Sequence, residues 1–203
     1  MPVFYQQQMN DDTRLGIWKI EESEDFFKRN VPVHRDVTHP HKRLQHLAGR
    51  FLLQYLFPDF PYKLIQIADT RKPFLPDEQY HFSISHCGDY AAAIVSSTRR
   101  VGIDVEEPKE MILRLADKFT TQDEIGRLNL TEELNAENLT LIWSVKEAVF
   151  KWYGYGNVDF RKDIQLNALD QETKEIGCWF VKSNAELKIG YELLDGLVCS
   201  WVV

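Results

Sequence analysis

The segment VGIDVE, residues 101–106, alternates apolar and polar side chains with unusual clarity. Successive side chains of a β-strand point to opposite faces, so this alternation predicts a strand with one buried face and one face free for chemistry. The free face carries two carboxylates and a glycine, which leaves room for a ligand to approach the backbone. The buried face holds Val101, Ile103 and Val105, and the other face holds Gly102, Asp104 and Glu106.

The chain beyond this strand becomes helical and then returns to strands. Apolar spacing predicts helices from Met111 through Leu128 and from Leu139 through Tyr153, and the glycines after Tyr153 can end the second helix. The C-terminal segments alternate in polarity once more. Residues 194–197, with the sequence LDGL, are typical of a two-residue hairpin turn.

The chain before this strand shows the same order of elements. Apolar residues at helical spacing predict a helix from His41 to Phe57, which Pro58 ends. Short strands are expected near Phe82 and over residues 91–97. Helix followed by strands thus occurs once before residue 100 and once after it. This order predicts an α+β fold of two similar halves, 1–100 and 101–203, that share an interface.

Composition limits the class of function. The chain has 203 residues, of which 44% are hydrophobic, so it can bury a full core. Its formal net charge of -7 argues against nucleic-acid binding, which needs many cations to neutralise phosphates. Basic residues nevertheless gather between Lys28 and Arg50. This pattern suits a small polyanionic ligand, although a solvated helix face explains it equally well.

The sequence also indicates a compartment. No stretch is apolar enough to cross a bilayer, and the N-terminus lacks the features of a secretory signal. The cysteines at positions 87, 178 and 199 form no C-x-x-C pair, which favours a reducing environment. We therefore expect a cytoplasmic monomer without a membrane role.

The two carboxylates of the strand, Asp104 and Glu106, suit a hard cation. Magnesium takes oxygen ligands and is commonly held by one or two carboxylates together with substrate phosphates. A third acid could come from Asp123 or its neighbour Glu124, although Thr120 and Thr121 before them also predict a helix cap there. Without such context, an Asp-x-Glu pair more often simply faces solvent.

The helix that ends near Tyr153 has two contrasting stripes. At about 100° per residue, its apolar stripe serves the core, whereas Trp143, Glu147 and Lys151 share nearly the opposite side. Glu147 and Lys151 could be an exposed ion pair at i, i+4. The large aromatic Trp143 beside them favours a site instead, in which the lysine holds a phosphate and the glutamate takes a proton or binds metal.

The loop after the strand near Phe82 carries Ser85 and His86. A hydrolase with Asp104 orienting the histidine is one interpretation, but the serine and histidine are sequence neighbours and no Gly-x-Ser-x-Gly turn is present. A set of donors to a phosphate oxygen fits better, and an ordinary hydrogen-bonded turn histidine remains an alternative.

Four segments in order, RKPFLPD, FSISH, VGIDVE and WSVKEAVFK, resemble those of the Sfp-type 4'-phosphopantetheinyl transferases. The resemblance covers about the central half of the chain. It implies the fold of that family, in which two similar α/β halves form an intramolecular pseudo-dimer. It also implies that coenzyme A binds between the halves.

The resemblance further implies roles for individual residues. Metal ligands are implied at Asp104, Glu106, Asp123 (with Glu124 adjacent) and Glu147, and catalytic roles at Glu147, Lys151 and His86. Coenzyme A contacts are implied at Ser85, His86, Lys151, Arg71, Lys72, Pro73, Arg50 and Arg43, with Lys42 as the neighbouring alternative to Arg43.

The implied activity is transfer of 4'-phosphopantetheine from coenzyme A to a serine of an acyl or peptidyl carrier protein, as in fatty acid biosynthesis, with release of 3',5'-ADP. Magnesium, or manganese in its place, is the implied metal. A non-catalytic coenzyme A or carrier-binding module and a metal-dependent phosphohydrolase are the alternatives. Carrier recognition is expected in the segment from Glu107 to Thr121, through Met111, Ile112 and Leu115, unless these pack inside the domain.

Overall fold

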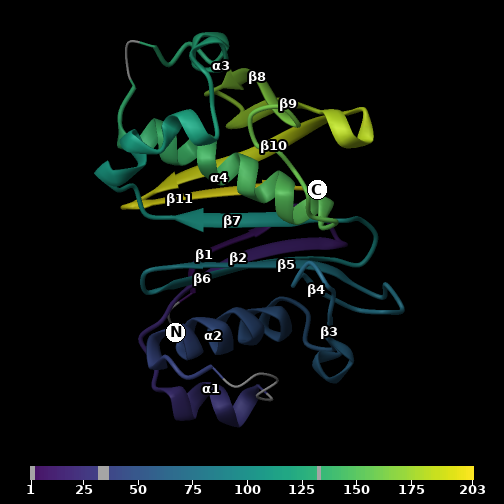
Figure 1. Ribbon diagram of the computed structural model, residues 1–203. Helices are drawn as coiled ribbons and strands as arrows, with labels where there is room; N and C mark the ends of the chain where they lie inside the picture. Colours follow the sequence, from purple (N-terminus) through teal and green to yellow (C-terminus); the bar gives the residue numbers. More distant parts are fainter. Residues whose placement is uncertain (1–2, 32–36, 132–133) are drawn as a thin grey trace.

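The computed structural model describes residues 3–31, 37–131 and 134–203. The basic stretch that the sequence places between Lys28 and Arg50 therefore lies partly outside the described residues. Within the described ranges, no helix is long and apolar enough to cross a membrane. The described elements form two large antiparallel sheets, each with helices on its outer side, and one short hairpin (Figure 1).

The first sheet has the strand order β1-β2-β6-β5. These strands are β1 (Val3–Gln8), β2 (Thr13–Lys19), β5 (His81–Cys87) and β6 (Tyr90–Ser96). Helix α2 (Pro40–Leu56) covers its outer face, and α1 (Glu24–Asn30) packs on α2. The predicted helix from His41 to Phe57 is confirmed within one residue at each end. The short hairpin joins β3 (Gln66–Ile67) to β4 (Pro73–Phe74).

The second sheet has the strand order β7-β11-β10-β9-β8. These strands are β7 (Gly102–Glu106), β8 (Ile164–Asp170), β9 (Glu175–Phe180), β10 (Ala185–Leu194) and β11 (Leu197–Val202). Helix α4 (Ala136–Tyr153) lies across β7 and β11, and α3 (Gln122–Arg127) packs near β8.

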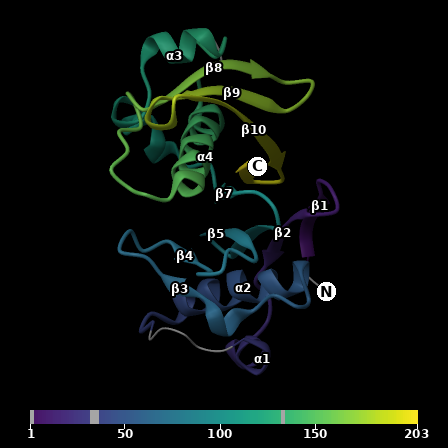
Figure 2. The ribbon, with the colours of Figure 1, turned by 90° about the vertical axis from the view of Figure 1, so that its right-hand side faces the viewer.

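The two sheets meet through an apolar layer of their own. Leu15, Ile17 and Ile94 of the first sheet are fully buried against Ile103 and Cys199 of the second. Figure 2, in which the view is rotated by 90° about the vertical axis, shows α2 and α4 on the outer sides of this pair of sheets. The layers are therefore helix, sheet, sheet and helix, and the mixed α+β class is confirmed.

Strand β7 has the two faces that its alternation predicts. Its valine and isoleucine side chains lie in the layer between the sheets, whereas Gly102 and Asp104 face α4. The helix backbone passes so close to Gly102 that an added β-carbon would overlap the carbonyl oxygen of Ala148. The glycine thus sets the distance between α4 and the strand that carries the acids.

The predicted helix from Met111 through Leu128 is wrong as a single element. Two short 3-10 helices, Glu110–Arg114 and Ala116–Lys118, precede α3 instead. Thr121 begins α3 as its N-cap, because its hydroxyl oxygen accepts a hydrogen bond from the backbone of Glu124 at 3.2 Å. The cap that the threonines predicted is therefore real, and it divides the segment.

Two turns follow the chemistry that the sequence predicts. Helix α4 ends at Gly154, whose φ of 75° is left-handed. The LDGL turn joins β10 to β11 with Gly196 at a φ of 71°. The hairpin β1–β2 and helix α1 carry no recognisable sequence motif, and their formation follows from burial of Leu15, Ile17 and Phe27.

We predict that Gly102→Ala lowers the free energy of unfolding by about 2 to 3 kcal/mol, because its methyl group pushes α4 away from β7. Urea denaturation measures the change. Gly126→Ala in α3 is the matched control: a β-carbon there meets nothing within 4 Å. Its helical position leaves stability unchanged or raises it by up to about 1 kcal/mol. Equal stability of the two variants would contradict the close packing of α4 on Gly102.

Candidate active site

Three elements meet at a buried ion pair. The Lys151 ammonium of α4 lies 2.5 Å from Oδ1 of Asp104 on β7 and 2.8 Å from the Ser85 hydroxyl on β5. Ser85 in turn donates to the same Asp104 oxygen at 2.9 Å. Asp104 is 2% exposed, and the Lys151 side chain is 25% exposed. The lysine is thus held in place while its ammonium stays within reach of a ligand.

The other carboxylate oxygens of this cluster are less well satisfied. Oδ2 of Asp104 is buried and has no hydrogen-bond partner among the described residues. Glu106 accepts a hydrogen bond of 3.4 Å from the indole nitrogen of Trp143. Burial, and then the charge of Asp104, raise the pKa of Glu106 above its usual range. Trp143 therefore covers an acid of the cluster, as its place on the polar stripe indicated.

Glu147 completes the cluster from α4, one turn before Lys151. Burial raises its pKa to about 7; the Lys151 ammonium opposes this shift, and the negative charges of Asp104 and Glu106 add to it. A carboxyl group that titrates near neutral pH is suited to accept a proton from a reacting hydroxyl. Glu147 thus differs in chemistry from an exposed surface glutamate.

The cluster has the donor chemistry of a divalent-cation site. Three carboxylates, from Asp104, Glu106 and Glu147, influence one another and face one ammonium group. Oxygen ligands of this kind suit Mg²⁺, and the unpartnered buried oxygen of Asp104 fits the same interpretation. Across the described ranges, however, no three His, Cys, Asp or Glu side chains already converge on one coordination position. Convergence of the predicted acids is therefore only partial.

The structure does not bring the predicted ligand Asp123 into this cluster. Asp123 is exposed in the first turn of α3. Its neighbour Glu124 is buried and bonded to Lys146, with 2.8 Å between Nζ and Oε2, and to the hydroxyl of Thr120 at 2.6 Å. The backbone nitrogen of Leu166 also donates to Glu124 at 2.8 Å. Because these partners occupy both oxygens, Glu124 has a structural role in fixing α3 to α4 and β8.

His86 lies next to the ion pair on β5, with an exposed side chain. Partial loss of hydration lowers the pKa of His86 below its usual range, and the ammonium groups of Lys151 and Lys42 act in the same direction. Lys42 of α2 is therefore close enough to influence the histidine. The two ammonium groups and the imidazole could together serve one polyanionic ligand.

The two arginines predicted on the early helix have partners within the first half. Arg43 donates to Oε1 of Glu24 at 2.8 Å and to the carbonyl oxygen of Val37 at 2.7 Å. Arg50 is 5% exposed and bonded to His46 at 2.9 Å. Of the two alternatives Lys42 and Arg43, the structure thus places Lys42 on the side of His86. Coenzyme A contacts by Arg43 and Arg50 stay predictions.

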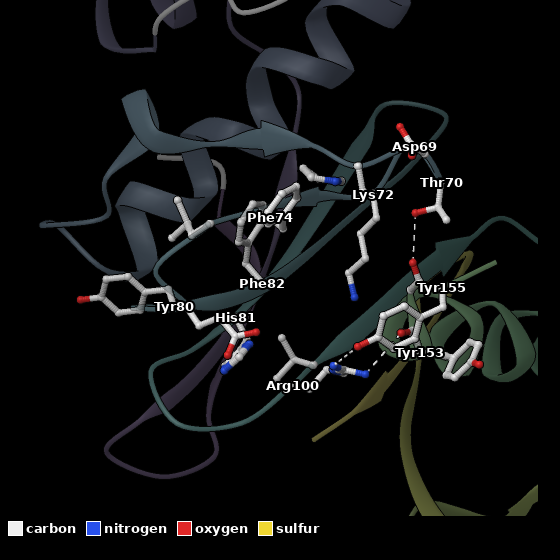
Figure 3. Close-up of a pocket in the computed structure, with 16 residues that line it drawn as sticks. Asp69, Thr70, Lys72, Phe74, Tyr80, His81, Phe82, Arg100, Tyr153 and Tyr155 are labelled. Carbon is white, nitrogen blue, oxygen red and sulfur yellow. Dashed lines mark hydrogen bonds between the residues drawn. The ribbon is translucent and has the colours of Figure 1, made fainter. Parts of the chain in front are cut away.

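A cavity of about 200 Å³ adjoins Lys151 between the two halves. Its walls include Arg71, Lys72 and Pro73, the turn predicted to meet a nucleotide. A larger cavity of about 410 Å³ shares Lys72 and Pro73 and extends toward Arg100 (Figure 3). The ammonium of Lys72 does not point freely into either cavity, because it donates to the carbonyl oxygen of Lys151 at 2.6 Å.

The sequence reasoning missed several residues of this region. The sequence pattern of α4 gives Lys146 no role, yet its side chain is fully buried and paired with Glu124. Thr70 and Arg100 reach the end of α4 from loops 84 and 53 residues away along the chain. Spacing along the chain cannot predict such contacts. The one available signal was the pair of basic residues, Arg99 and Arg100, in the turn after residue 97.

Comparison with known proteins identifies a family and several relatives. Residues 100–200 match the family model described as the 4'-phosphopantetheinyl transferase superfamily. Enterobactin synthase component D of Escherichia coli (strain K12) is 38% identical over 113 residues, which cover 54% of each chain. The 4'-phosphopantetheinyl transferase psf-1 of Bacillus pumilus is 37% identical over 78 residues, covering 38% of this chain and 33% of the relative.

A longer alignment reaches into the first half. The 4'-phosphopantetheinyl transferase gsp of Aneurinibacillus migulanus is 25% identical over 158 residues, 76% of this chain and 64% of the relative. The chain spans about half the length of the enterobactin synthase components that it matches. The chain belongs to the 4'-phosphopantetheinyl transferase superfamily. The resemblance to its Sfp-type members, inferred from four motifs, is confirmed.

We predict that Glu147→Gln stabilises the metal-free protein at pH 8 by about 1 to 3 kcal/mol. The folded protein holds the Glu147 proton up to a pKa of about 7, against a usual value of 4.5. Ionisation therefore favours the unfolded chain as pH rises through this window, and the amide removes that cost.

Urea denaturation at pH 4 and pH 8 measures the effect, with the exposed Glu186→Gln as control. The gain in the free energy of unfolding should appear at pH 8. It should largely vanish at pH 4, where the Glu147 carboxyl group is mostly protonated in both the folded and the unfolded protein. A gain of the same size at both pH values would contradict the raised pKa.

Proposed function

We propose that the protein transfers 4'-phosphopantetheine from coenzyme A to a serine of a carrier protein, which converts the apo carrier to its holo form. One observation carries this proposal: the ammonium of Lys151, on a side chain that is 25% exposed, is fixed by Asp104 and Ser85 and lies beside Glu106 and Glu147 where the two halves meet. A diphosphate needs such a cation, and a serine nucleophile needs such a base. The names of the relatives support the same activity.

In this proposal, residues of both halves hold coenzyme A. Lys151 and Ser85 contact the diphosphate, and His86 with Lys42 binds an outer phosphate oxygen. Arg71 and Pro73 line the cavity of about 200 Å³ beside Lys151, which would take part of the nucleotide. The two halves with their similar layers would then be the members of an intramolecular pseudo-dimer that shares one ligand.

Asp104, Glu106 and Glu147 are the residues that would hold a magnesium ion, or manganese in its place. When bound, this ion neutralises the charge of the diphosphate. The unpartnered Oδ2 of Asp104 supports this assignment. Asp123 is exposed in the first turn of α3, and no described contact joins it to these acids, so its role as a further ligand stays a prediction.

The reaction is an in-line phosphoryl transfer. The hydroxyl oxygen of the carrier serine forms a bond to the β-phosphorus of coenzyme A, the bond from that phosphorus to the bridging oxygen breaks, and 3',5'-ADP leaves with the electron pair. Glu147, beside Lys151 and the acids of β7, takes the serine proton directly or through water. Lys151 orients the diphosphate and offsets the charge that gathers on the leaving group.

We predict that incubation with coenzyme A, magnesium and a panel of apo carrier proteins raises the mass of at least one carrier by one phosphopantetheinyl group. Glu147→Ala and Lys151→Met should lower the rate by about 100-fold or more, because they remove the base and the phosphate cation. Lys162→Met, at an 83% exposed side chain, is the control and should keep the wild-type rate.

Other outcomes point to other classes of protein. Cleavage of coenzyme A with no change in carrier mass would indicate a phosphohydrolase, and coenzyme A binding without any product would indicate a binding module. Full transfer by Glu147→Ala would remove the assigned base. Circular dichroism of each variant tests that the fold is retained.

We further propose that the carrier docks on the segment between β7 and α3. Met111 is 65% exposed and Leu113 is 41% exposed, whereas Ile112 and Leu115 pack against the core of the second half. Of the three residues predicted to contact the carrier, only Met111 is therefore available. Together with Leu113 it forms an exposed apolar surface. The segment follows β7 in the chain and contacts α4, so a carrier docked there would bring its serine toward Glu147.

We predict that Met111→Asp raises the KM for the carrier about tenfold and leaves the KM for coenzyme A unchanged, since a buried apolar contact is worth roughly 1 to 2 kcal/mol. Steady-state kinetics with each substrate varied in turn measures both constants. Val181→Asp, at a 43% exposed valine of the second half, controls for added charge. A rise in the coenzyme A constant alone would contradict carrier docking at this surface.

A further inference from the structure

The C-terminal end of α4 receives side-chain donors from the first half of the chain. The last carbonyl groups of a helix lack partners within the helix. Here Lys72 donates to the carbonyl oxygen of Lys151 at 2.6 Å and of Trp152 at 3.4 Å. Thr70 donates to the carbonyl oxygen of Gly154 at 3.0 Å.

A further donor comes from the turn between β6 and β7. The guanidinium of Arg100 donates to the carbonyl oxygen of Tyr153 at 3.4 Å and to the hydroxyl of Tyr155 at 2.9 Å, and it lies over the Tyr155 ring (Figure 3). We call Thr70, Lys72 and Arg100 the α4 clasp. The clasp satisfies the carbonyl groups of four successive residues, 151 to 154.

Gly154 is shaped to admit this clasp. An added β-carbon at Gly154 would lie 2.6 Å from Cδ and 2.8 Å from Nζ of Lys72. Non-bonded carbon atoms ordinarily stay near 3.5 to 4.0 Å apart, so a side chain at this position displaces the lysine. The absence of a side chain at Gly154 therefore allows both the left-handed backbone at the end of α4 and the close contact with Lys72.

Electrostatics favours the helix end as the true partner of Lys72. Burial lowers the pKa of Lys72 to about 8, and repulsion from Arg100 acts in the same direction. Two cations held side by side need a negative partner. The C-terminal carbonyl groups of α4 supply one, because the helix dipole concentrates partial negative charge there.

The clasp acts on the residue that the proposed reaction depends on. Lys151 accepts the short hydrogen bond of Lys72 through its backbone, and its side chain carries the ammonium held by Asp104 and Ser85. The position of the last turn of α4 thus decides where that ammonium lies. A small displacement of such a group can lower a rate by about 100-fold.

We propose that Thr70, Lys72 and Arg100 are positioning residues: they hold the last turn of α4 so that Lys151 faces the diphosphate of the substrate. This inference rests on the proposed transfer reaction and changes one role within it. Lys72, predicted to touch the nucleotide, acts instead through Lys151, whereas Arg71 and Pro73 beside it remain candidates for direct contact.

Two unrelated substitutions test the inference. Lys72→Met removes the ammonium and keeps the aliphatic stem, and Gly154→Ala displaces the same ammonium by steric overlap. Both are expected to lower kcat about tenfold or more while the KM for coenzyme A stays within about twofold. A raised KM in Lys72→Met together with normal kinetics in Gly154→Ala would overturn the inference, because it would make Lys72 a direct ligand.

Matched controls separate positioning from folding. Gly196→Ala introduces alanine at nearly the same left-handed φ, 71° against 75°, where no atom lies within 4 Å, and should keep wild-type kinetics. Thr70→Val should lower kcat, and Thr70→Ser, which keeps the donor, should restore it. Equal loss in Gly196→Ala and Gly154→Ala would show that backbone strain alone accounts for the effect.

A readout without turnover distinguishes failure of the inference from failure of the proposed function. Acetylation of Lys151 by acetic anhydride, followed by peptide mass spectrometry, reports how firmly its ammonium is held. The rate should rise several-fold in Lys72→Met and Gly154→Ala and stay unchanged in Gly196→Ala. An unchanged rate in the first two variants overturns the clasp. A raised rate in a protein that labels no carrier supports the clasp and rejects the transfer reaction.

Discussion

The contact between Lys151 and Asp104 is the interaction on which the site depends. It joins a helix of the second half to the strand at that half's edge, and Ser85 connects both to the first half. Burying a carboxylate with 2% exposure is costly unless a cation and a hydroxyl satisfy it. The same lysine remains 25% exposed. It can therefore serve a ligand while it stabilises the acid.

The surrounding fold keeps this contact rigid. The apolar layer between the sheets fixes β7 against the first half, and Gly102 lets α4 lie directly on β7. The clasp adds a hold on the far end of the helix. Groups that are fixed before the substrate arrives need little reorganisation during the reaction, which is how preorganised charges lower a barrier.

Local patterns predicted the parts of this arrangement that depend on nearby residues. The period of two in VGIDVE and the period of 3.6 from Trp143 to Lys151 placed the acids and the ammonium on facing surfaces, and the motif order identified the family. The division of residues 111–128 into three short helices depended on Thr121, whose cap outweighed the apolar spacing. The roles of Lys72 and Glu124 depended on partners more than 20 residues away, so spacing alone could not assign them.

The central claim is that the diphosphate of coenzyme A binds against Lys151 at the seam of the two halves. A crystal structure of the protein with coenzyme A and magnesium tests it most directly. The account predicts a diphosphate oxygen within hydrogen-bond distance of the Lys151 ammonium and a cation on the free oxygen of Asp104. Coenzyme A bound elsewhere, with the Lys151–Asp104–Ser85 contacts unchanged, would contradict it.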